Sequence, residues 1–140
     1  MIRFTVYGSP VAQGRPRATN INGHVVVYDP GKSKRYKDYI RLAASNHAPE
    51  KLLEGPIALW VKVYRPIPKS FSKKKQKLAE MGRIRPTTKP DVSNYIKIIE
   101  DALNGVIWKD DSQIVRLLVD KYYSEKPRIE IEVEELKVNE

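Results

Sequence analysis

The chain has 140 residues and no cysteine, and its 26 Lys and Arg against 17 Asp and Glu give a formal net charge of +9. This length suits one domain over residues 1–140, because two domains of half the size would each have a marginal core. The lack of cysteine excludes disulfide scaffolds, zinc–cysteine sites and thiol nucleophiles. No apolar run reaches the roughly 20 residues of a membrane helix. We therefore expect a soluble, cytoplasmic protein without a membrane partner.

Positive charge is concentrated in the first part of the chain. Residues 1–89 hold nineteen Lys and Arg and five Asp and Glu, whereas residues 90–140 hold seven and twelve. Two separate basic segments favour binding to nucleic acid phosphates. One of them is a Lys-rich insertion at about residues 69–89, which by itself could be a solvated helix that only aids solubility. The candidate DNA-binding residues are Arg15, Arg17, Lys73, Lys74, Lys75, Arg83, Arg85 and Lys89.

The first half of the sequence predicts short strands and two helices. Residues 2–7 alternate as in a strand, and the Asn22-Gly23 pair predicts a hairpin turn between strands at 19–21 and 24–28. Pro30 and Gly31 are expected to break the chain before the first helix. The elements expected after this break are a helix over 33–47, a strand over 57–64 and a short basic helix over 72–81.

The second half contains the clearest helix of the chain, over residues 91–104. Its apolar residues recur at helical spacing, Asp91 is placed as N-cap, and Asn104-Gly105 supplies the stop. Strands are expected over 113–122 and 128–136, and the last alternates Ile and Val with Glu, so that one of its faces is buried. These elements predict an α+β fold, a two-layer sandwich in which helices cover a mixed β-sheet.

Candidate catalytic residues flank the helix over 91–104. Asp91, Asn94 and Lys97 lie at its start, and Asp110 and Asp111 follow its end, where the chain can fold back along it. Phosphodiester hydrolysis needs oxygen ligands for a hard divalent cation and a positive group near the phosphate. An alternative interpretation gives these residues structural roles and no catalytic one. In it, Asp91 caps the helix, Lys97 and Asp101 form a surface ion pair, and Asp110 and Asp111 are turn residues.

Residues 89–113 resemble the RusA family of Holliday-junction resolvases, which are common in bacteria and their prophages. The matching residues are Lys89-Pro90-Asp91, Asn94, Lys97, Asp101-Ala102-Leu103-Asn104 and Trp108-Lys109-Asp110-Asp111-Ser112-Gln113. Gly14-Arg15-Pro16-Arg17 and Val27-Tyr28-Asp29-Pro30 also resemble the family. The resemblance therefore extends over most of the chain and agrees with the predicted fold.

The resemblance implies a homodimer that cuts four-way junction DNA symmetrically in recombination and repair, with Mg²⁺ or Mn²⁺ as cofactor. Family roles fall on Asp91 and Asp111 as catalytic metal ligands and on Lys97 as catalytic lysine, with Asp110 as an additional metal ligand. The family pattern Asp-x-Asp-Asn is here Asp-Val-Ser-Asn, so Ser93 stands where a metal carboxylate is expected.

The serine leaves two interpretations open. Ser93 or Asn94, directly or through water, could complete the metal shell of a working nuclease, although a hydroxyl is a weaker Mg²⁺ ligand than a carboxylate. Alternatively, the chain is a noncatalytic protein that binds junctions or other nucleic acids without cutting them.

Overall fold

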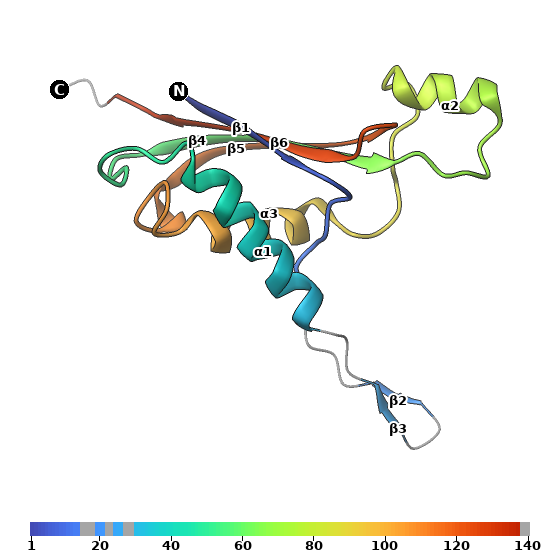
Figure 1. The fold of residues 1–140 in the computed structure, drawn as a ribbon, viewed down its shortest axis with the longest axis horizontal. Coiled ribbons are helices and arrows are strands. Elements are labelled where there is room, and N and C mark those ends of the chain that lie inside the picture. Colours follow the sequence, from blue (N-terminus) through green and yellow to red (C-terminus); the bar gives the residue numbers. More distant parts are fainter. Residues whose placement is uncertain (15–18, 22–23, 27–29, 138–140) are drawn as a thin grey trace.

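The computed structural model describes residues 1–14, 19–21, 24–26 and 30–137. Within them the chain forms three α-helices, one 3₁₀ helix and six strands (Figure 1). In chain order these elements are β1 (Ile2–Tyr7), β2 (Thr19–Ile21), β3 (His24–Val26), α1 (Pro30–Ser45), β4 (Ile57–Pro66), α2 (Lys73–Glu80), α3 (Val92–Leu103), η1 (Asp111–Gln113), β5 (Ile114–Ser124) and β6 (Arg128–Glu135).

Four strands form the central sheet in the order β1-β6-β4-β5. The β1–β6 and β6–β4 pairs are antiparallel, whereas β4 and β5 are parallel. The parallel pair requires a crossover between the end of β4 and the start of β5, and α2, α3 and η1 lie in that crossover. The sheet is therefore mixed, as the sequence predicted.

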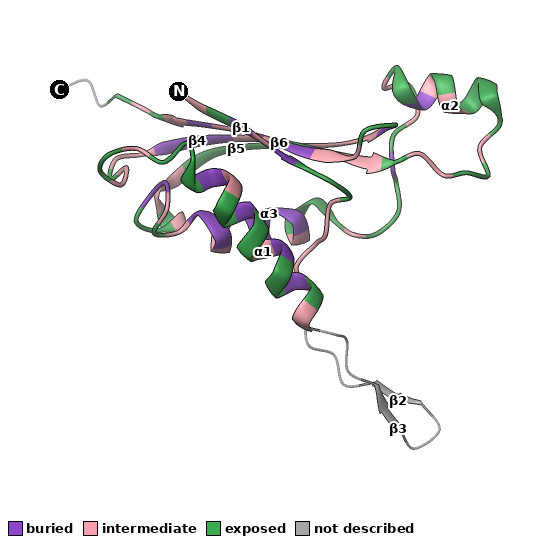
Figure 2. Cartoon of the chain, in the orientation of Figure 1, coloured by how far each residue is buried: buried purple, intermediate pink, exposed green. Residues whose placement is uncertain are grey.

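Helices α1 and α3 pack against one face of the sheet, and their buried sides face it (Figure 2). The core between the layers takes alternate residues of β4 and β6, such as Leu59, Val61 and Ile131, which are at most 1% exposed. In α3 the expected apolar stripe is buried except for Val92, which is 40% exposed at the first turn. The predicted two-layer α+β sandwich is confirmed.

The other face of the sheet has no helix over it and carries charged and aromatic side chains. The glutamates of β6 alternate with buried Ile and Val, as expected. The rings of Tyr64 and Tyr122 stack there with centroids 5.3 Å apart, between the guanidinium groups of Arg128 and Arg85. This face is therefore polar and separate from the helical layer.

Several element boundaries differ from the prediction. Helix α1 begins at Pro30 and not at residue 33, because the first helical turn tolerates proline, whose N–H has no partner there and whose φ is already helical. Strands β4 and β5 each extend to their paired ends, Pro66 and Ser124. The hairpin pairs β2 with β3, while its turn, Asn22-Gly23, and residues 27–29 lie outside the described residues.

The hairpin and α2 project from opposite parts of the layered core (Figure 1). The β2–β3 hairpin lies beyond the N-terminal end of α1, and α2 lies beyond the sheet, where Ala79 is its buried contact residue. No helix among the described residues is long and apolar enough to cross a membrane.

Candidate active site

Asp91 occupies the N-cap position of α3 in an extended conformation, with φ −72° and ψ 155°. The position agrees with the prediction, but the carboxylate makes no capping hydrogen bond. The loop before it is held from β5, because Lys121 Nζ donates to the backbone carbonyls of Thr88 at 3.0 Å and Pro90 at 3.1 Å. The Asp91 carboxylate is therefore exposed and does not cap the helix. The backbone just before it is held in place by the hydrogen bonds from Lys121.

A tight reversal follows α3. Asn104 is the C-cap, and Gly105 adopts φ +79°, which a residue with a side chain rarely adopts. The buried Trp108 closes the turn, because its Nε1 donates to Asn104 Oδ1 at 2.6 Å and its backbone carbonyl accepts from the Gly105 N–H at 2.8 Å. The chain after Trp108 therefore returns along α3, as the prediction required.

The side chain of Gln113 fixes the returning segment. Its Oε1 accepts from the backbone N–H groups of Lys109 at 3.0 Å and Asp110 at 2.9 Å. Its Nε2 donates to the carbonyls of Leu53 at 2.8 Å and Gly55 at 3.1 Å. These bonds tie the returning segment to the loop before β4, so that the position of η1 relative to the sheet is set by one amide.

Asp110 and Asp111 have different roles in this segment. Asp110 is the N-cap of η1 and accepts from the Ser112 N–H at 3.0 Å. Hydrogen bonds from the Ser112 side chain, and then from its backbone, lower the pKa of Asp110 below its ordinary value. Asp111 begins η1. Asp110 therefore has the role of a turn residue that the structural interpretation predicts. Asp111 differs from it, because its carboxyl group acts on Glu100 of α3.

Asp111 acts electrostatically on Glu100, a half-buried acid near the C-terminal end of α3. Burial, followed by the carboxyl group of Asp111, raises the pKa of Glu100 to about 7. Lys97 opposes this shift. Glu100 therefore lies within electrostatic range of both Asp111 and Lys97.

Lys97 also pairs with Asp101, one turn further along α3. Its Nζ lies 3.6 Å from Asp101 Oδ1, and the lysine side chain is 59% exposed. The surface ion pair between Lys97 and Asp101 that the structural interpretation predicts is therefore present. The pair does not bury the ammonium group of Lys97, which remains accessible to a phosphate.

Asp111 and Lys97 both act electrostatically on Glu100, and Asp91 is not among the groups that shift the pKa of Glu100. In the described part of the chain, no three His, Cys, Asp or Glu side chains are arranged to hold one metal ion. Asp91 lies at the N-terminal end of α3, whereas Glu100 lies in its last turn.

Ser93 and Asn94 lie on the first turn of α3. Ser93 is exposed, and Asn94 lines a cavity of about 390 Å³ together with Lys32, Lys89 and Pro90. The backbone carbonyl of Asn94 accepts from the Gln13 N–H at 3.0 Å, which ties the first loop to this end of α3. The cavity brings one lysine from each basic segment next to Asp91.

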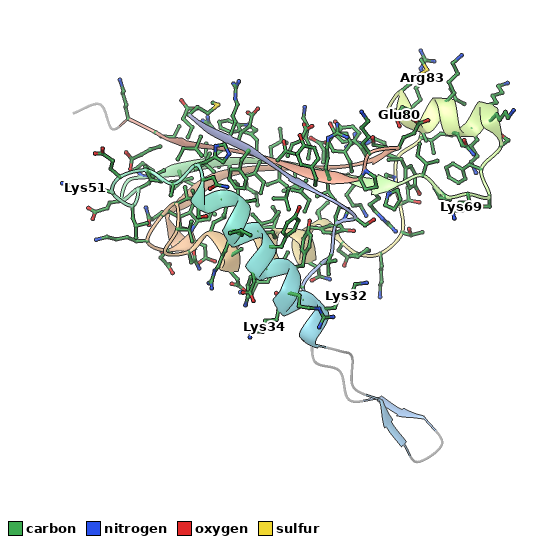
Figure 3. The ribbon with its side chains drawn as sticks, viewed as in Figure 1. Lys32, Lys34, Lys51, Lys69, Glu80 and Arg83 are labelled. Atoms are coloured by element: carbon green, nitrogen blue, oxygen red, sulfur yellow. The ribbon has the colours of Figure 1, made fainter. Side chains whose placement is uncertain are left out.

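The predicted DNA-binding residues differ in their surroundings. Arg15 and Arg17 lie outside the described residues. Arg85 contacts Asp120 of β5 at 2.7 Å and covers the Tyr122 ring. The other predicted residues, Lys73, Lys74, Lys75, Arg83 and Lys89, are exposed. Lys32, Lys34 and Lys69, which were not in the predicted set, add positive charge at the N-terminal end of α1 and before α2 (Figure 3).

Sequence reasoning did not single out Glu100 or Lys121, and it named Gln113 only as part of the family-like segment, without a role. A signal existed for Glu100, because it follows Ser93 by seven residues and Lys97 by three, and residues at these spacings share one side of a helix. No local pattern identified Lys121, whose hydrogen bonds reach residues more than thirty positions away.

The donor chemistry of the predicted acids fits a divalent cation. Mg²⁺ is commonly held by one or two carboxylates, with water and substrate phosphate oxygens completing its shell. The half-exposed Asp111 and the exposed Asp91 and Asp110 are the carboxylates of the predicted set that could serve as such ligands. The site thus suits a metal shared with the substrate better than a cage made by protein alone.

Comparison with known proteins gives two matches. The family model described as Endodeoxyribonuclease RusA matches residues 7–134. The chain is also 58% identical over 137 residues to the uncharacterized protein YqaN of Bacillus subtilis (strain 168), with 96% of each chain covered. Both matches include the segment that carries Asp91, Lys97 and Asp111.

Proposed function

Because the chain belongs to the RusA endodeoxyribonuclease family, we propose that it is a magnesium-dependent endonuclease that resolves four-way DNA junctions. The observation that carries this proposal is the family match over residues 7–134, a range that includes Asp91, Lys97 and Asp111. A carboxylate for a cation and an accessible ammonium group for a phosphate are the two components that phosphodiester cleavage needs.

Each candidate residue has a distinct role in the proposed reaction. Asp111 would hold the divalent cation, and Asp91 would contribute a carboxylate from the end of α3. Lys97 would stabilise the negative charge that develops on the phosphate. A bound Mg²⁺ or Mn²⁺ polarises the phosphate and activates water. The adjacent Asp110 orients this segment by capping η1.

The basic surface would bind the phosphates of the junction arms. Lys73, Lys74 and Lys75 on α2 are exposed, and Lys89 lies beside Lys32 at the cavity near Asp91. Such contacts give affinity without reading base sequence. A homodimer would place two equivalent sites on paired strands of a junction, since a twofold assembly matches the symmetry of that substrate.

A cleavage assay tests the proposal. Purified protein is incubated with a synthetic four-way junction in Mg²⁺, Mn²⁺ or EDTA. We expect paired, symmetric nicks that require metal and disappear in Asp111→Asn, while the Asp111→Asn protein still binds the junction. Glu134→Gln is the matched control, because it removes a carboxylate from β6, on the face of the sheet opposite α3. Metal-independent nicking, or nicking by Asp111→Asn, would refute the proposal.

A second candidate function is junction binding without cleavage. It is favoured by one observation, the serine at position 93, which removes a carboxylate near Asp91. Tight, salt-sensitive binding with no nicks at any metal concentration would establish it. In that case Ser93→Asp should restore cleavage if the missing carboxylate is the only defect.

A further inference from the structure

The cavity of about 390 Å³ next to Asn94 lies where the loop after β1 meets the N-terminal ends of α1 and α3. Three segments that are distant in sequence form its walls, and these segments fall within residues 10–14, 32–33 and 89–94. Its volume lies in the range of about 300–1,000 Å³ that is typical of small-molecule sites. The cavity is therefore large enough to hold a ligand and is made by the tertiary fold.

Hydrogen bonds hold these walls together. The Gln13 N–H donates to the Asn94 carbonyl at 3.0 Å, which joins the loop after β1 to α3. The Gly14 N–H donates to Ser33 Oγ at 3.3 Å, and that hydroxyl donates to the Ala12 carbonyl at 3.4 Å. Ser33 is only 7% exposed, so this contact lies inside the protein. The walls are therefore part of the folded framework.

The lining combines apolar surface with two amide side chains. Pro10, Val11 and Pro90 supply apolar surface, and Gln13 and Asn94 supply the amides. Proteins hold an unstacked nucleobase by apolar contacts to its faces and hydrogen bonds to its edge. The composition of this cavity therefore suits a nucleobase.

Gln13 contains a buried acceptor without a donor. Its Oε1 is buried, and no group within the described residues donates a hydrogen bond to it. An unpaired buried acceptor is unfavourable, so this oxygen favours a ligand that brings an N–H group. The amino groups of adenine, cytosine and guanine are such donors, whereas a phosphate diester has only acceptors. The side chain of Gln13 therefore favours a base over a phosphate.

Two lysines add positive charge to the same cavity. Lys32 lies at the N-terminal end of α1 (Figure 3), and Lys89 lies in the loop before α3. Both are exposed, and neither forms an ion pair with a described residue. Ammonium groups beside an apolar pocket suit the phosphates on either side of a single nucleotide.

We propose that this cavity binds one unstacked nucleotide of junction DNA, with its base at Gln13 and its flanking phosphates at Lys32 and Lys89. The inference rests on the DNA substrate of the proposed function and adds a position at which that substrate is read. Asp91 directly follows Pro90 of the cavity wall. The bound nucleotide would thus lie beside a candidate catalytic acid, and a base with an amino group would be preferred there.

Junctions labelled with 2-aminopurine test whether a base enters the cavity. Each junction carries this fluorescent base at one position beside the branch point, and its fluorescence rises when the base leaves the stack. In EDTA, we expect saturating wild-type protein to raise the fluorescence severalfold at one position. Val11→Phe narrows the cavity and should remove that rise. Leu42→Phe is the matched control, because it adds a ring at an exposed leucine of α1.

Gln13→Leu tests the hydrogen bond to the base. Fluorescence anisotropy in EDTA measures binding of junctions that carry A, C, G or T at the responsive position. We expect the wild type to bind the junction with T, which has no amino group, about fivefold or more weakly than the best of the others. Gln13→Leu should lose this preference. Replacing Lys32 and Lys89 by Met should weaken binding to all four junctions alike.

Circular dichroism and thermal unfolding establish that each variant is folded. With folded variants, a fluorescence rise in Val11→Phe equal to that of the wild type would overturn the inference. The same preference in Gln13→Leu as in the wild type would overturn it as well.

The outcomes separate this inference from the proposed nuclease, because every binding measurement is made without metal. If the wild type cuts junctions in Mg²⁺ but gives no fluorescence rise at any position, the nuclease stands and the nucleotide site is refuted. If the rise and the base preference are present and no metal supports cleavage, the nucleotide site stands and the nuclease is refuted. A wild type that binds no junction refutes both.

Discussion

Gln113 Nε2 donates a hydrogen bond to the carbonyl of Leu53 at 2.8 Å, across sixty residues of sequence. The same side chain accepts from the N–H groups of Lys109 and Asp110. One amide therefore joins the loop before β4 to the segment that carries Asp111. The position of that acid depends on this network, because η1 has only three residues and no buried side chain of its own.

The first prediction concerns this network. Gln113→Ala leaves backbone groups without partners, and we expect it to lower the free energy of unfolding by about 1–3 kcal/mol. Urea unfolding followed by circular dichroism measures the change. Gln76→Ala is a matched control, because the Gln76 side chain donates a hydrogen bond to the Phe71 carbonyl at 2.8 Å. Equal destabilisation by the two variants would contradict the role assigned to Gln113.

The second prediction is a pH dependence of stability. The folded-state pKa of Glu100 is about 7, above its ordinary value of 4.5, so the native state holds this proton more tightly than the unfolded chain. The contribution of Glu100 is therefore fully present below about pH 4.5 and is lost as the pH rises to about 7. In EDTA, Glu100→Gln should raise the melting temperature more at pH 8 than at pH 4.5.

Thermal unfolding at both pH values measures this difference between wild type and variant. Glu134→Gln serves again as the control and should leave the pH profile unchanged. An identical gain from Glu100→Gln at both pH values would show that the native state does not hold the proton of Glu100 through this range.

The third prediction separates Lys97 from its ion-pair partner. Asp101→Asn removes an exposed pair and should change the free energy of unfolding by no more than about 0.5 kcal/mol, while junction cleavage is retained. Lys97→Met should reduce cleavage by about a hundredfold or more, because it removes the positive group near the phosphate. Single-turnover cleavage rates test both variants, with Lys51→Met as the control lysine. Comparable loss in the two site variants would mean that the pair acts as a structural unit.

The fourth prediction concerns the lysines of α2. Lys73 and Lys74 are exposed, and if both contact phosphates, replacing them by Ala should reduce the slope of log K against log salt by about 1.8. Junction binding is measured by fluorescence anisotropy from low to moderate salt. The cleavage rate at saturating DNA should not change. A slope equal to that of the wild type would place the DNA elsewhere.

The sequence by itself determined those features that depend on local spacing. The apolar stripe of α3, its boundaries at Asp91 and Asn104, and the alternation of β6 follow from helical and strand periodicity. Each of these patterns repeats within a few residues, so a single segment contains the information. The reversal after Asn104-Gly105 was predicted on the same local grounds.

Only the tertiary structure decided which acids act on one another. The sequence grouped Asp91 with Asp111, and the folded chain adds the half-buried Glu100, whose pKa Asp111 raises. The position of the returning segment depends on the hydrogen bonds of Gln113 to Leu53 and Gly55 and on the backbone bonds of Leu53 to Ile107 and Lys109. Hydrogen bonds between segments distant in sequence leave no periodic signal, so the position of the site could be known only from the fold.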